Sequence, residues 1–188
     1  MKKVILSIIV LMLAALTSFS QNLESGYRGF AEAGICRGSL PDANVLGPMN
    51  ANRLNISTVH GYQFNPRFYL GGGLVNHIYT EGYYSISLFA NVRVDFLDKT
   101  KTPFVDFRGG HSFGDFVESL DFDGGYLAFS AGFRFNHCNI SLGWEGSAME
   151  YCKGAKLTDA TTCHLVANSF MIKFGFDWGG RAETSEKN

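Results

Sequence analysis

Apolar and polar residues alternate along most of this chain with a period of two. Within residues 84–97, one set of alternate positions is wholly apolar: Ile86, Leu88, Ala90, Val92, Val94 and Phe96. The intervening positions are mostly polar: Ser85, Ser87, Phe89, Asn91, Arg93 and Asp95. Because successive side chains of a strand point to opposite faces, this pattern predicts a strand with one apolar face. The whole chain gives eight predicted strands, at about 26–35, 53–64, 67–79, 84–97, 103–113, 124–136, 138–147 and 163–178.

Helical periodicity is absent from the sequence after residue 21. No segment there has apolar residues at helical spacing over three turns, and no apolar run reaches the roughly 20 residues of a membrane helix. Most predicted strands reach the roughly 9–11 residues of a spanning barrel strand. A chain without spanning helices crosses a bilayer only as a closed barrel, since lipid satisfies no backbone polar group. The pattern predicts an all-β fold, an eight-stranded antiparallel up-and-down transmembrane β-barrel.

The segment 67–79 is the least regular of the eight. The residues from Leu70 to Leu74, which include Gly71, Gly72 and Gly73, carry no polar marker on either face, so the inward positions of this strand stay open. The triple glycine does not fit a phosphate loop, which needs a following Lys and then Ser or Thr. We expect these glycines to relieve crowding inside a narrow barrel.

The connections between the predicted strands differ in length in a regular way. The short ones are Asn65–Pro66, 97–102 and the neighbourhood of His137; the long ones are 36–52, 114–123 and 148–162. Only 80–83 breaks the alternation. Short periplasmic turns and longer outer loops are typical of outer-membrane barrels. With the N-terminus in the periplasm, all the short turns except 80–83 fall on the periplasmic side.

Aromatic residues gather near the predicted strand ends. The periplasmic interface would hold Tyr27, Tyr62, Phe64, Phe68, Phe96, Phe104, Phe135 and Trp178. The other rim would hold Tyr79, Tyr83, Tyr84, Phe113 and Trp144. Two aromatic girdles around an apolar band anchor a barrel in a membrane.

Charged residues indicate which face of the barrel wall is polar. If the clean apolar face points outward, ten charged residues, five of each sign, point inward: Arg28, Glu32, Arg93, Asp95, Asp106, Arg108, Arg134, Glu145, Lys173 and Asp177. An eight-stranded barrel is just wide enough for side chains to fill it, and an unpaired buried charge is very costly. Most of these residues lie near periplasmic strand ends. We therefore expect an ionic plug in the periplasmic half of the lumen.

The pairing of the fourth and fifth strands is restricted by these charges. One register places Arg93 opposite Asp106, and another places Asp95 opposite Arg108. An intermediate register would oppose like charges, which is destabilising. The sequence leaves both favourable registers open.

The first 20 residues have the pattern of a secretory signal peptide, with Lys2 and Lys3, an uncharged run over 4–16, and small residues before Gln21. We expect a signal peptide at 1–20, a barrel at 21–178 and a polar tail at 179–188. Without the two lysines, 14 basic residues stand against 17 acidic ones, a net charge of −3. The basic residues are scattered, which does not indicate nucleic-acid binding.

Four segments carry a resemblance to a known family: GYRGF at 26–30, HGYQFNPRFYLGGG at 60–73, LFANVRVDFLD at 88–98 and PFVDFRGG at 103–110. They resemble the small outer-membrane β-barrel domain proteins of Gram-negative bacteria, such as the OmpA and OmpX barrels. The resemblance implies residence in the outer membrane, with its lipids and the barrel-assembly machinery as partners. Members typically end on an aromatic residue that this machinery reads, whereas here ten polar-rich residues follow Trp178.

Four cysteines would lie in an oxidising compartment after export. Cys152 and Cys163 flank the last long loop, and a bond between them would stiffen it. Cys36, at the outer end of the first strand, is an alternative partner for Cys163. Cys138 lies at a periplasmic turn, too far from either. The connectivity among Cys36, Cys152 and Cys163 stays open.

Candidate chemistry is sparse. None of the five histidines falls in a metal-ligand spacing: His60, His77, His111, His137 and His164. A serine, histidine and acid triad needs its side chains on one face, but the neighbours His111 and Ser112 point to opposite faces. Glu145 and Ser147 share a face but have no histidine near them in sequence. We therefore predict no catalytic, cofactor-binding or metal-binding residues.

The leading interpretation is a non-enzymatic barrel with a side-chain-plugged lumen and a structural or loop-mediated role. The loops 36–52, 114–123 and 148–162 would serve adhesion or interaction with an extracellular partner, and the tail could bind a periplasmic one. The plugged lumen argues against a general porin, whose water-filled channel needs about 16 strands. Two alternatives stay open: a lipid-modifying outer-membrane enzyme and a narrow, low-conductance pore.

Overall fold

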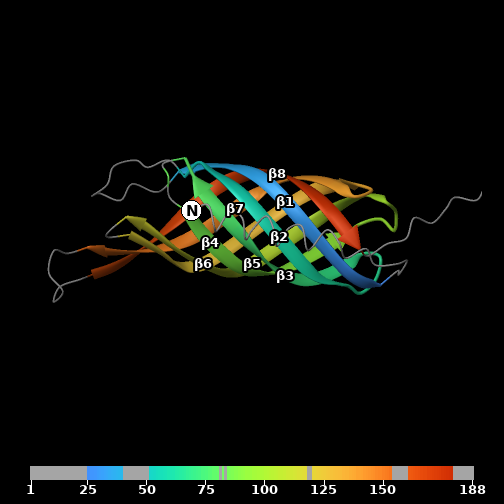
Figure 1. The fold of residues 1–188 in the computed structure, drawn as a ribbon, viewed down its shortest axis with the longest axis horizontal. Coiled ribbons are helices and arrows are strands. Elements are labelled where there is room, and N and C mark those ends of the chain that lie inside the picture. The colour runs from blue at the N-terminus through green and yellow to red at the C-terminus, as the bar shows by residue number, and fades with distance from the viewer. Residues whose placement is uncertain are drawn as a thin grey trace, which may run out of the picture.

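Eight antiparallel strands close into a barrel in the computed structural model of this chain (Figure 1). The structure describes residues 25–39, 51–80, 82, 84–117, 120–153 and 161–179. The strands are β1 (Gly26–Ser39), β2 (Arg53–Gln63), β3 (Phe68–Tyr79), β4 (Tyr84–Asp95), β5 (Lys101–Val117), β6 (Leu120–Phe135), β7 (Cys138–Lys153) and β8 (Thr161–Gly179). Each strand pairs with the next in sequence, and β8 pairs back with β1. The predicted fold class is confirmed.

The predicted segments at the two ends of the chain lie largely outside the described residues. Among the described residues, no helix is long and apolar enough to cross a bilayer. The predicted signal peptide, 1–20, lies outside the described residues, and so does the predicted tail beyond Gly179. The last strand ends at Gly179, one residue after the predicted barrel boundary.

The second half of the barrel has longer strands than the sequence pattern predicted. β5 to β8 contain 17, 16, 16 and 19 residues, whereas β2 to β4 contain 11, 12 and 12. Pairing continues to Val117 opposite Leu120 in one hairpin and to Lys153 opposite Thr161 in the other. Most of the predicted loop 114–123 and the ends of the predicted loop 148–162 are therefore strand, and these two predictions were wrong.

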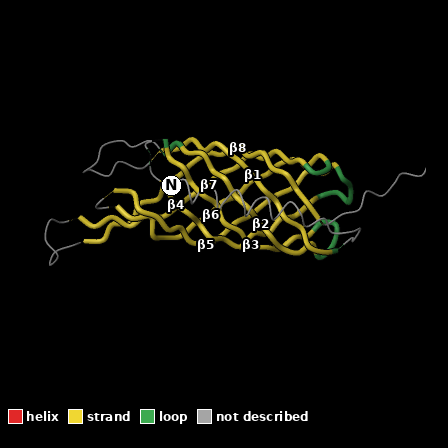
Figure 2. Tube along the Cα trace, viewed as in Figure 1, coloured by secondary structure: helices red, strands yellow, loops and turns green. Residues whose placement is uncertain are grey.

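The sequence pattern misses these extensions because a strand that projects beyond the barrel has water on both faces. Alternation between apolar and polar residues arises only where the two faces meet different environments. The backbone of a projecting strand still forms hydrogen bonds with its neighbouring strand, and these bonds do not require alternating side chains. Figures 1 and 2 show the β5–β6 and β7–β8 hairpins extending past one end of the barrel. We call this end the hairpin end.

The opposite end, which we call the turn end, carries three short turns within the described chain, at 64–67, 96–100 and 136–137 (Figure 2). In the first, Asn65 Oδ1 accepts hydrogen bonds from two backbone N–H groups that follow it, both at 2.9 Å. In the third, Asn136 has a φ of 56°, in the left-handed region that asparagine tolerates better than most residues. The short turns predicted on this side are confirmed.

Alternate residues of each strand are buried inside the barrel or exposed on its outer face. In β4, Ser87 is fully buried while its neighbour Leu88 is 53% exposed. The orientation of β3, which the sequence left open, is now defined. Tyr69 and His77 are buried and Leu70 is exposed, so the odd-numbered residues of β3 face inward.

Two of the three consecutive glycines share this inward side of β3. A methyl group on Gly71 would collide with the Tyr69 hydroxyl, and one on Gly73 would lie 3.0 Å from the Phe89 ring. Relief of crowding is therefore confirmed at Gly71 and Gly73. It does not account for Gly72, where the nearest atom to a methyl group would be a backbone oxygen 3.3 Å away.

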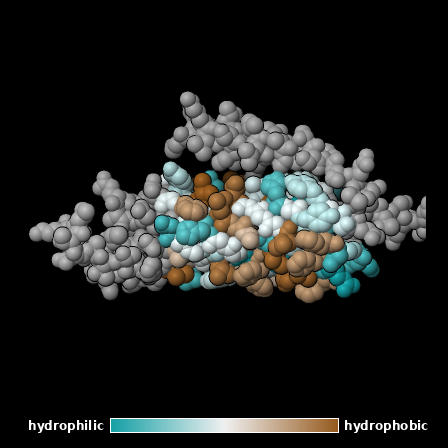
Figure 3. Space-filling model, turned by 90° about the horizontal axis from the view of Figure 1, so that it is seen from below, coloured by the Kyte–Doolittle hydropathy of each residue, from teal (hydrophilic) through white to brown (hydrophobic). Residues whose placement is uncertain are grey.

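The outer face of the barrel is apolar. Its exposed side chains include Leu88, Leu127, Phe129, Phe170 and Phe174. Figure 3 shows large hydrophobic patches on one side of the wall, with hydrophilic side chains toward both ends and some between the patches. An apolar exterior around a charged interior inverts the arrangement of a water-soluble barrel. It is the arrangement of a membrane barrel.

The predicted aromatic girdles are largely present. At the turn end, five of the predicted residues are 37–52% exposed: Tyr62, Phe64, Phe68, Phe96 and Phe135. Tyr27 lies there half-buried. At the other rim, Tyr84, Phe113 and Trp144 are exposed, and Tyr83 lies outside the described residues.

Three aromatic residues differ from this prediction. Phe104 and Tyr79 are buried in the interior, because they occupy the same alternate positions as the inward-facing Asp106 and His77. Trp178 is only 5% exposed. Its indole ring lies so close to Gly29 that a methyl group there would be 2.5 Å from the ring. Phe104 and Tyr79 show that proximity to a strand end alone does not define a girdle residue, because the alternation must also place it outward. Trp178 has the outward phase of Phe174 and Phe176, and its ring is packed against Gly29 and His60.

Candidate functional site

The barrel interior is the most distinctive chemical feature of the molecule. In the described residues it holds six basic and five acidic side chains, each at most 6% exposed: Arg28, Arg53, Arg93, Arg108, Arg134 and Lys173; Glu32, Asp95, Asp106, Glu145 and Asp177. All ten predicted inward charges are confirmed. Arg53 was missed because it is the first residue of its strand, although it alternates in phase with Asn55 and Ser57.

A first group, the turn-end cluster, lies near the short turns and consists of Arg28, Asp95, Arg134 and Asp177. Arg28 Nη1 lies 3.0 Å from Asp95 Oδ2, and its Nη2 lies 2.7 Å from Asp177 Oδ2. Arg134 Nη1 lies 3.1 Å from the same Asp95 oxygen. Two positive and two negative charges therefore balance in this cluster.

A second group, the central ring, consists of Glu32, Arg93, Asp106 and Arg108. Arg93 lies 2.8 Å from Glu32 through Nη2 and 2.9 Å from Asp106 through Nε. Arg108 bridges the same two carboxylates, with its Nε 2.9 Å from Asp106 and its Nη2 on Glu32. Each arginine contacts both carboxylates and each carboxylate contacts both arginines, so the ring is closed and neutral.

The central ring decides between the two strand registers that the sequence left open. Arg93 lies directly opposite Asp106 in the β4–β5 ladder, and Asp95 lies opposite Phe104. The first predicted register is therefore correct. It brings opposite charges together on one face, where cross-strand pairs stabilise a sheet.

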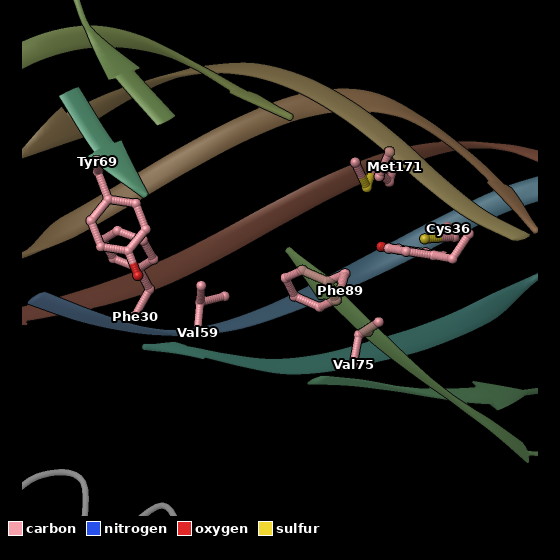
Figure 4. Packing of buried hydrophobic residues seen from close by; sticks show 9 residues of the cluster. Phe30, Cys36, Val59, Tyr69, Val75, Phe89 and Met171 are labelled. Carbon is pink, nitrogen blue, oxygen red and sulfur yellow. The ribbon is translucent and has the colours of Figure 1, made fainter. Parts of the chain in front are cut away.

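Aromatic rings separate the turn-end cluster from the central ring. The Arg28 guanidinium carbon lies 4.7 Å from the centre of the Phe30 ring, and that of Arg93 lies 3.9 Å from it. The Arg93 guanidinium carbon also lies 4.4 Å from the centre of the Phe104 ring. The centres of the Tyr69 and Phe30 rings are 4.8 Å apart (Figure 4). Arginine over an aromatic face is attracted by the ring quadrupole, most strongly when water is absent. These rings occupy the space between the two charged groups.

A third group, the hairpin-end cluster, surrounds Glu145 and lies nearer the hairpin end. Arg53 contacts Glu145 Oε1 through both Nε and Nη2. Asn55 donates to Glu145 Oε2 at 3.0 Å, and the Tyr126 hydroxyl donates to the same oxygen at 3.1 Å. The sequence had suggested that the interior charges lie in the half of the barrel near the short turns. The hairpin-end cluster shows that they also extend beyond that half.

Next to this cluster lies an arrangement that resembles a catalytic triad. His77 Nδ1 lies 2.8 Å from Asn55 Oδ1 and 3.5 Å from Glu145 Oε1, and its Nε2 lies 2.9 Å from Ser87 Oγ. Glu145 on β7 is far in sequence from His77 on β3 and Ser87 on β4, so spacing could not reveal the arrangement. Ser87 has no exposed surface. Its hydroxyl continues to Ser112 Oγ at 2.6 Å, so the arrangement satisfies buried polar groups and presents no accessible nucleophile.

The candidate catalytic residues considered from the sequence do not form one site in the structure. His111 is outward and about half exposed, with its Nε2 2.6 Å from Asp123 Oδ1, while Ser112 is fully buried. Their predicted opposite orientation is confirmed. Within the part of the chain that the structure describes, no group of three or more His, Cys, Asp or Glu residues is placed to hold a metal ion.

The structure defines the state of two of the four cysteines. Cys36 is a buried free thiol whose Sγ lies 3.0 Å from Asn55 Nδ2, and Cys138 is an exposed free thiol. Cys36 is therefore not joined to Cys163 here. The side chains of Cys152 and Cys163 lie outside the described residues, so the bond predicted between them stays a prediction.

These features define a class: the small eight-stranded barrels typified by outer-membrane proteins of Gram-negative bacteria. Among solved structures, Neisserial surface protein A matches with a TM-score of 0.52 and 13% identity, over 81% of this chain and 97% of that one. No protein-family model matches the sequence, and no curated protein does.

Two further barrels match less well. The N-terminal β-barrel domain of Pseudomonas aeruginosa OprF has a TM-score of 0.47 and 11% identity, over 84% of this chain and 100% of that one. Ail, the attachment invasion locus protein of Yersinia pestis, has a TM-score of 0.47 and 16% identity, over 81% of this chain and 99% of that one. At such identities the shared property is the fold.

Proposed function

We propose that this chain is an integral outer-membrane protein of a Gram-negative bacterium, exported by its signal peptide, whose closed barrel anchors an interaction surface outside the cell. The apolar outer face supports insertion among outer-membrane lipids. Folding into that membrane would use the barrel-assembly machinery. The role is non-enzymatic: it is structural and adhesive, and it resides in the projecting hairpins.

The projecting hairpins carry this proposal. β4 pairs with β5 only as far as Ile86 opposite Phe113, and β1 pairs with β8 only as far as Ser39 opposite Asn168. Beyond these points the β5–β6 and β7–β8 ladders continue. A strand needs only about 9–11 residues to span a membrane, so the extra length lies outside it. A sheet held by a rigid barrel is a precise platform for binding.

The charged interior supports a plugged lumen and argues against transport. The central ring reaches from β1 to β4 and β5, and the rings of Phe30, Tyr69 and Phe104 fill the space beside it. Planar-bilayer recording of the purified protein should show no stable current. A reproducible single-channel conductance would instead favour the narrow pore.

The enzyme alternative has its own test. Ser87, the only hydroxyl bonded to the interior histidine among the described residues, is fully buried, which supports a non-enzymatic role. Mass analysis of lipid A from cells with and without the protein should give the same species. A change that disappears in Ser87→Ala would favour the lipid-modifying enzyme.

Topology can be tested with a pair of epitope insertions. A tag between residues 118 and 119, which join Val117 of β5 to Leu120 of β6 in the sequence, should be labelled by antibody on intact cells. A matched tag between Asn136 and His137 should be labelled only after the outer membrane is permeabilised. The opposite result would place the hairpins in the periplasm and end the proposal.

Adhesion can be tested with the same host cells. Bacteria that express the full chain are compared with bacteria that express a variant in which residues 115–121 are replaced by a two-residue turn. The probes are epithelial monolayers and immobilised extracellular-matrix proteins. We expect the wild type to adhere and the variant to lose adhesion while its barrel still shows heat-dependent gel mobility. Equal adhesion by both would contradict a role for this hairpin.

A further inference from the structure

The two projecting hairpins place metal-binding residue types in one row across four strands. Asp115 of β5 lies directly opposite Asp121 of β6, which lies opposite Glu150 of β7. Glu150 in turn lies opposite His164 of β8. Residues directly opposite one another in an antiparallel ladder share a face, with Cβ atoms about 4.5–5.5 Å apart. The ladder therefore brings together three carboxylates and an imidazole that form no motif in the sequence.

Alternation along the strands places this row on the outer face of the sheet. On β7, Glu150 is in phase with Trp144, which is 43% exposed. On β6, Asp121 is in phase with Asp123, whose side chain is 63% exposed. Cys152 follows Glu150 by two residues on β7, so it shares this face. Three adjacent strands thus bring two carboxylates, a thiol and an imidazole to one face: Asp121, Glu150, Cys152 and His164.

The structure describes the backbone of these four residues but not their side chains. The finding that no group of described residues is placed to hold a metal ion therefore does not extend to this face of the hairpins.

The electrostatics of the row favour a bound cation. Like charges directly opposite one another in a ladder are destabilising, yet carboxylates occupy three successive strands at Asp115, Asp121 and Glu150. Beyond Phe113 of β5 and Trp144 of β7, no lysine or arginine occupies the same face in the described part of the two hairpins. A divalent cation would offset this repulsion.

The ladder also separates Cys152 from the partner expected from the sequence. Cys152 lies opposite Thr162, whereas Cys163 lies opposite Tyr151, so the two cysteines occupy opposite faces of the β7–β8 sheet. A disulfide needs Cβ atoms that point toward one another, about 3.5–4.5 Å apart. This register disfavours a Cys152–Cys163 bond and leaves Cys152 as a thiol on the same face as His164.

We propose that the projecting hairpins bind one Zn²⁺ ion on their outer face, with Asp121, Glu150, Cys152 and His164 as ligands. Sulfur, imidazole nitrogen and carboxylate oxygen are the donor types that zinc uses, and four donors complete a tetrahedral site. Calcium takes oxygen ligands alone and would leave the cysteine and the histidine unused. Binding releases the proton of the Cys152 thiol, because the thiolate is the ligand. This inference needs the hairpins to lie in water but does not depend on their adhesive role.

Zinc binding is measured by titration calorimetry on the full mature chain, refolded in nonionic micelles and kept metal-free and reduced with a phosphine. We expect one ion per chain. His164→Ala should weaken binding by more than about tenfold, since even the outer-shell partners of a metal ligand are worth about 10–100-fold. The matched control is His111→Ala, an exposed histidine that contacts Asp123 and lies outside the four ligands, and it should bind zinc as the wild type does. Heat-dependent gel mobility checks that each barrel is folded.

Cobalt as the probe metal tests the thiolate. The Co²⁺ complex of the wild type should show a thiolate-to-metal charge-transfer absorption band. This band should disappear in Cys152→Ser and persist in Cys138→Ser, whose exposed thiol lies at the turn end of the barrel. Cys163→Ser should also retain it. A band that persists in Cys152→Ser would reject the proposed ligand.

X-ray absorption on the wild-type zinc complex needs no variant. It should show one sulfur at about 2.3 Å, with nitrogen and oxygen donors at about 2.0–2.2 Å. A shell of nitrogen and oxygen alone would overturn the proposal. So would the absence of zinc binding by the reduced wild type, equal affinity in His164→Ala, or a Cys152–Cys163 disulfide in peptides of the protein isolated from cells. A negative adhesion assay leaves these outcomes unchanged, because they are measured on the purified chain.

Discussion

Arg93 on β4 lies directly opposite Asp106 on β5, and its Nε donates to Asp106 Oδ2 at 2.9 Å. The same guanidinium also donates through Nη2 to Glu32, on the far side of the lumen. One side chain therefore fixes the pairing of two neighbouring strands and joins them to a third.

Removal of Arg93 should strongly destabilise the barrel. Arg93→Met leaves Asp106 and Glu32 buried with one cation fewer, and breaking a buried ion pair costs about 3–5 kcal/mol. Urea unfolding in micelles measures this loss. Arg37→Met, at an exposed position of β1, is the control and should change stability by less than about 0.5 kcal/mol. A similar effect from the two substitutions would show that the central ring contributes nothing.

Glycines inside and outside the barrel should respond differently to a methyl group. Gly71→Ala should destabilise by roughly 1–3 kcal/mol, because the new methyl collides with the Tyr69 hydroxyl. Gly109→Ala is the matched control, since its methyl would lie 3.7 Å from the Phe107 ring, an ordinary contact. Equal midpoints for the two variants in urea would mean that Tyr69 does not occupy the inward side of β3.

An arginine on the outer face tests membrane insertion directly. Leu88→Arg should cost about 2–4 kcal/mol in lipid vesicles, as charged residues do near the middle of a bilayer. Leu97→Arg, at a turn, should cost about 0–1 kcal/mol by the same rule. Both leucines are about half exposed, so a water-soluble barrel would tolerate both changes equally. That outcome would reject the membrane location.

Thiol reactivity should separate the two free cysteines. In a background where Cys152 and Cys163 are replaced by serine, a maleimide reagent should modify Cys138 quickly, because it is exposed at a turn. Cys36 should react only after unfolding, since it is buried inside the barrel. Mass spectrometry of peptides before and after urea treatment measures this order. Rapid labelling of Cys36 in the folded protein would show that solvent enters the lumen.

Strands and interior charges could be predicted from the sequence because a membrane and a narrow lumen impose opposite demands on alternating residues. Arg93 and Leu88 are each assigned to their face by this rule. The partner of Arg93 on the adjacent strand could be narrowed to two registers by charge alone.

Contacts across the lumen could not be predicted in the same way. Alternation gives the face of a residue but not its height in the barrel relative to a distant strand, which depends on how the strands tilt and stagger. The contact of Arg93 with Glu32 and that of Arg53 with Glu145 both depend on this geometry. The hairpin extensions were missed for a different reason, since strands in water on both faces have no alternation to detect.

The central ring also links electrostatics to the order of folding. Its carboxylate on β1 meets guanidinium groups from β4 and β5 only when the sheet has curled fully upon itself. A partly curled sheet in the membrane would hold these charges apart at a high energetic cost. Half-closed forms are therefore poorly populated, and the final joining of β1 to β8 becomes an all-or-none event.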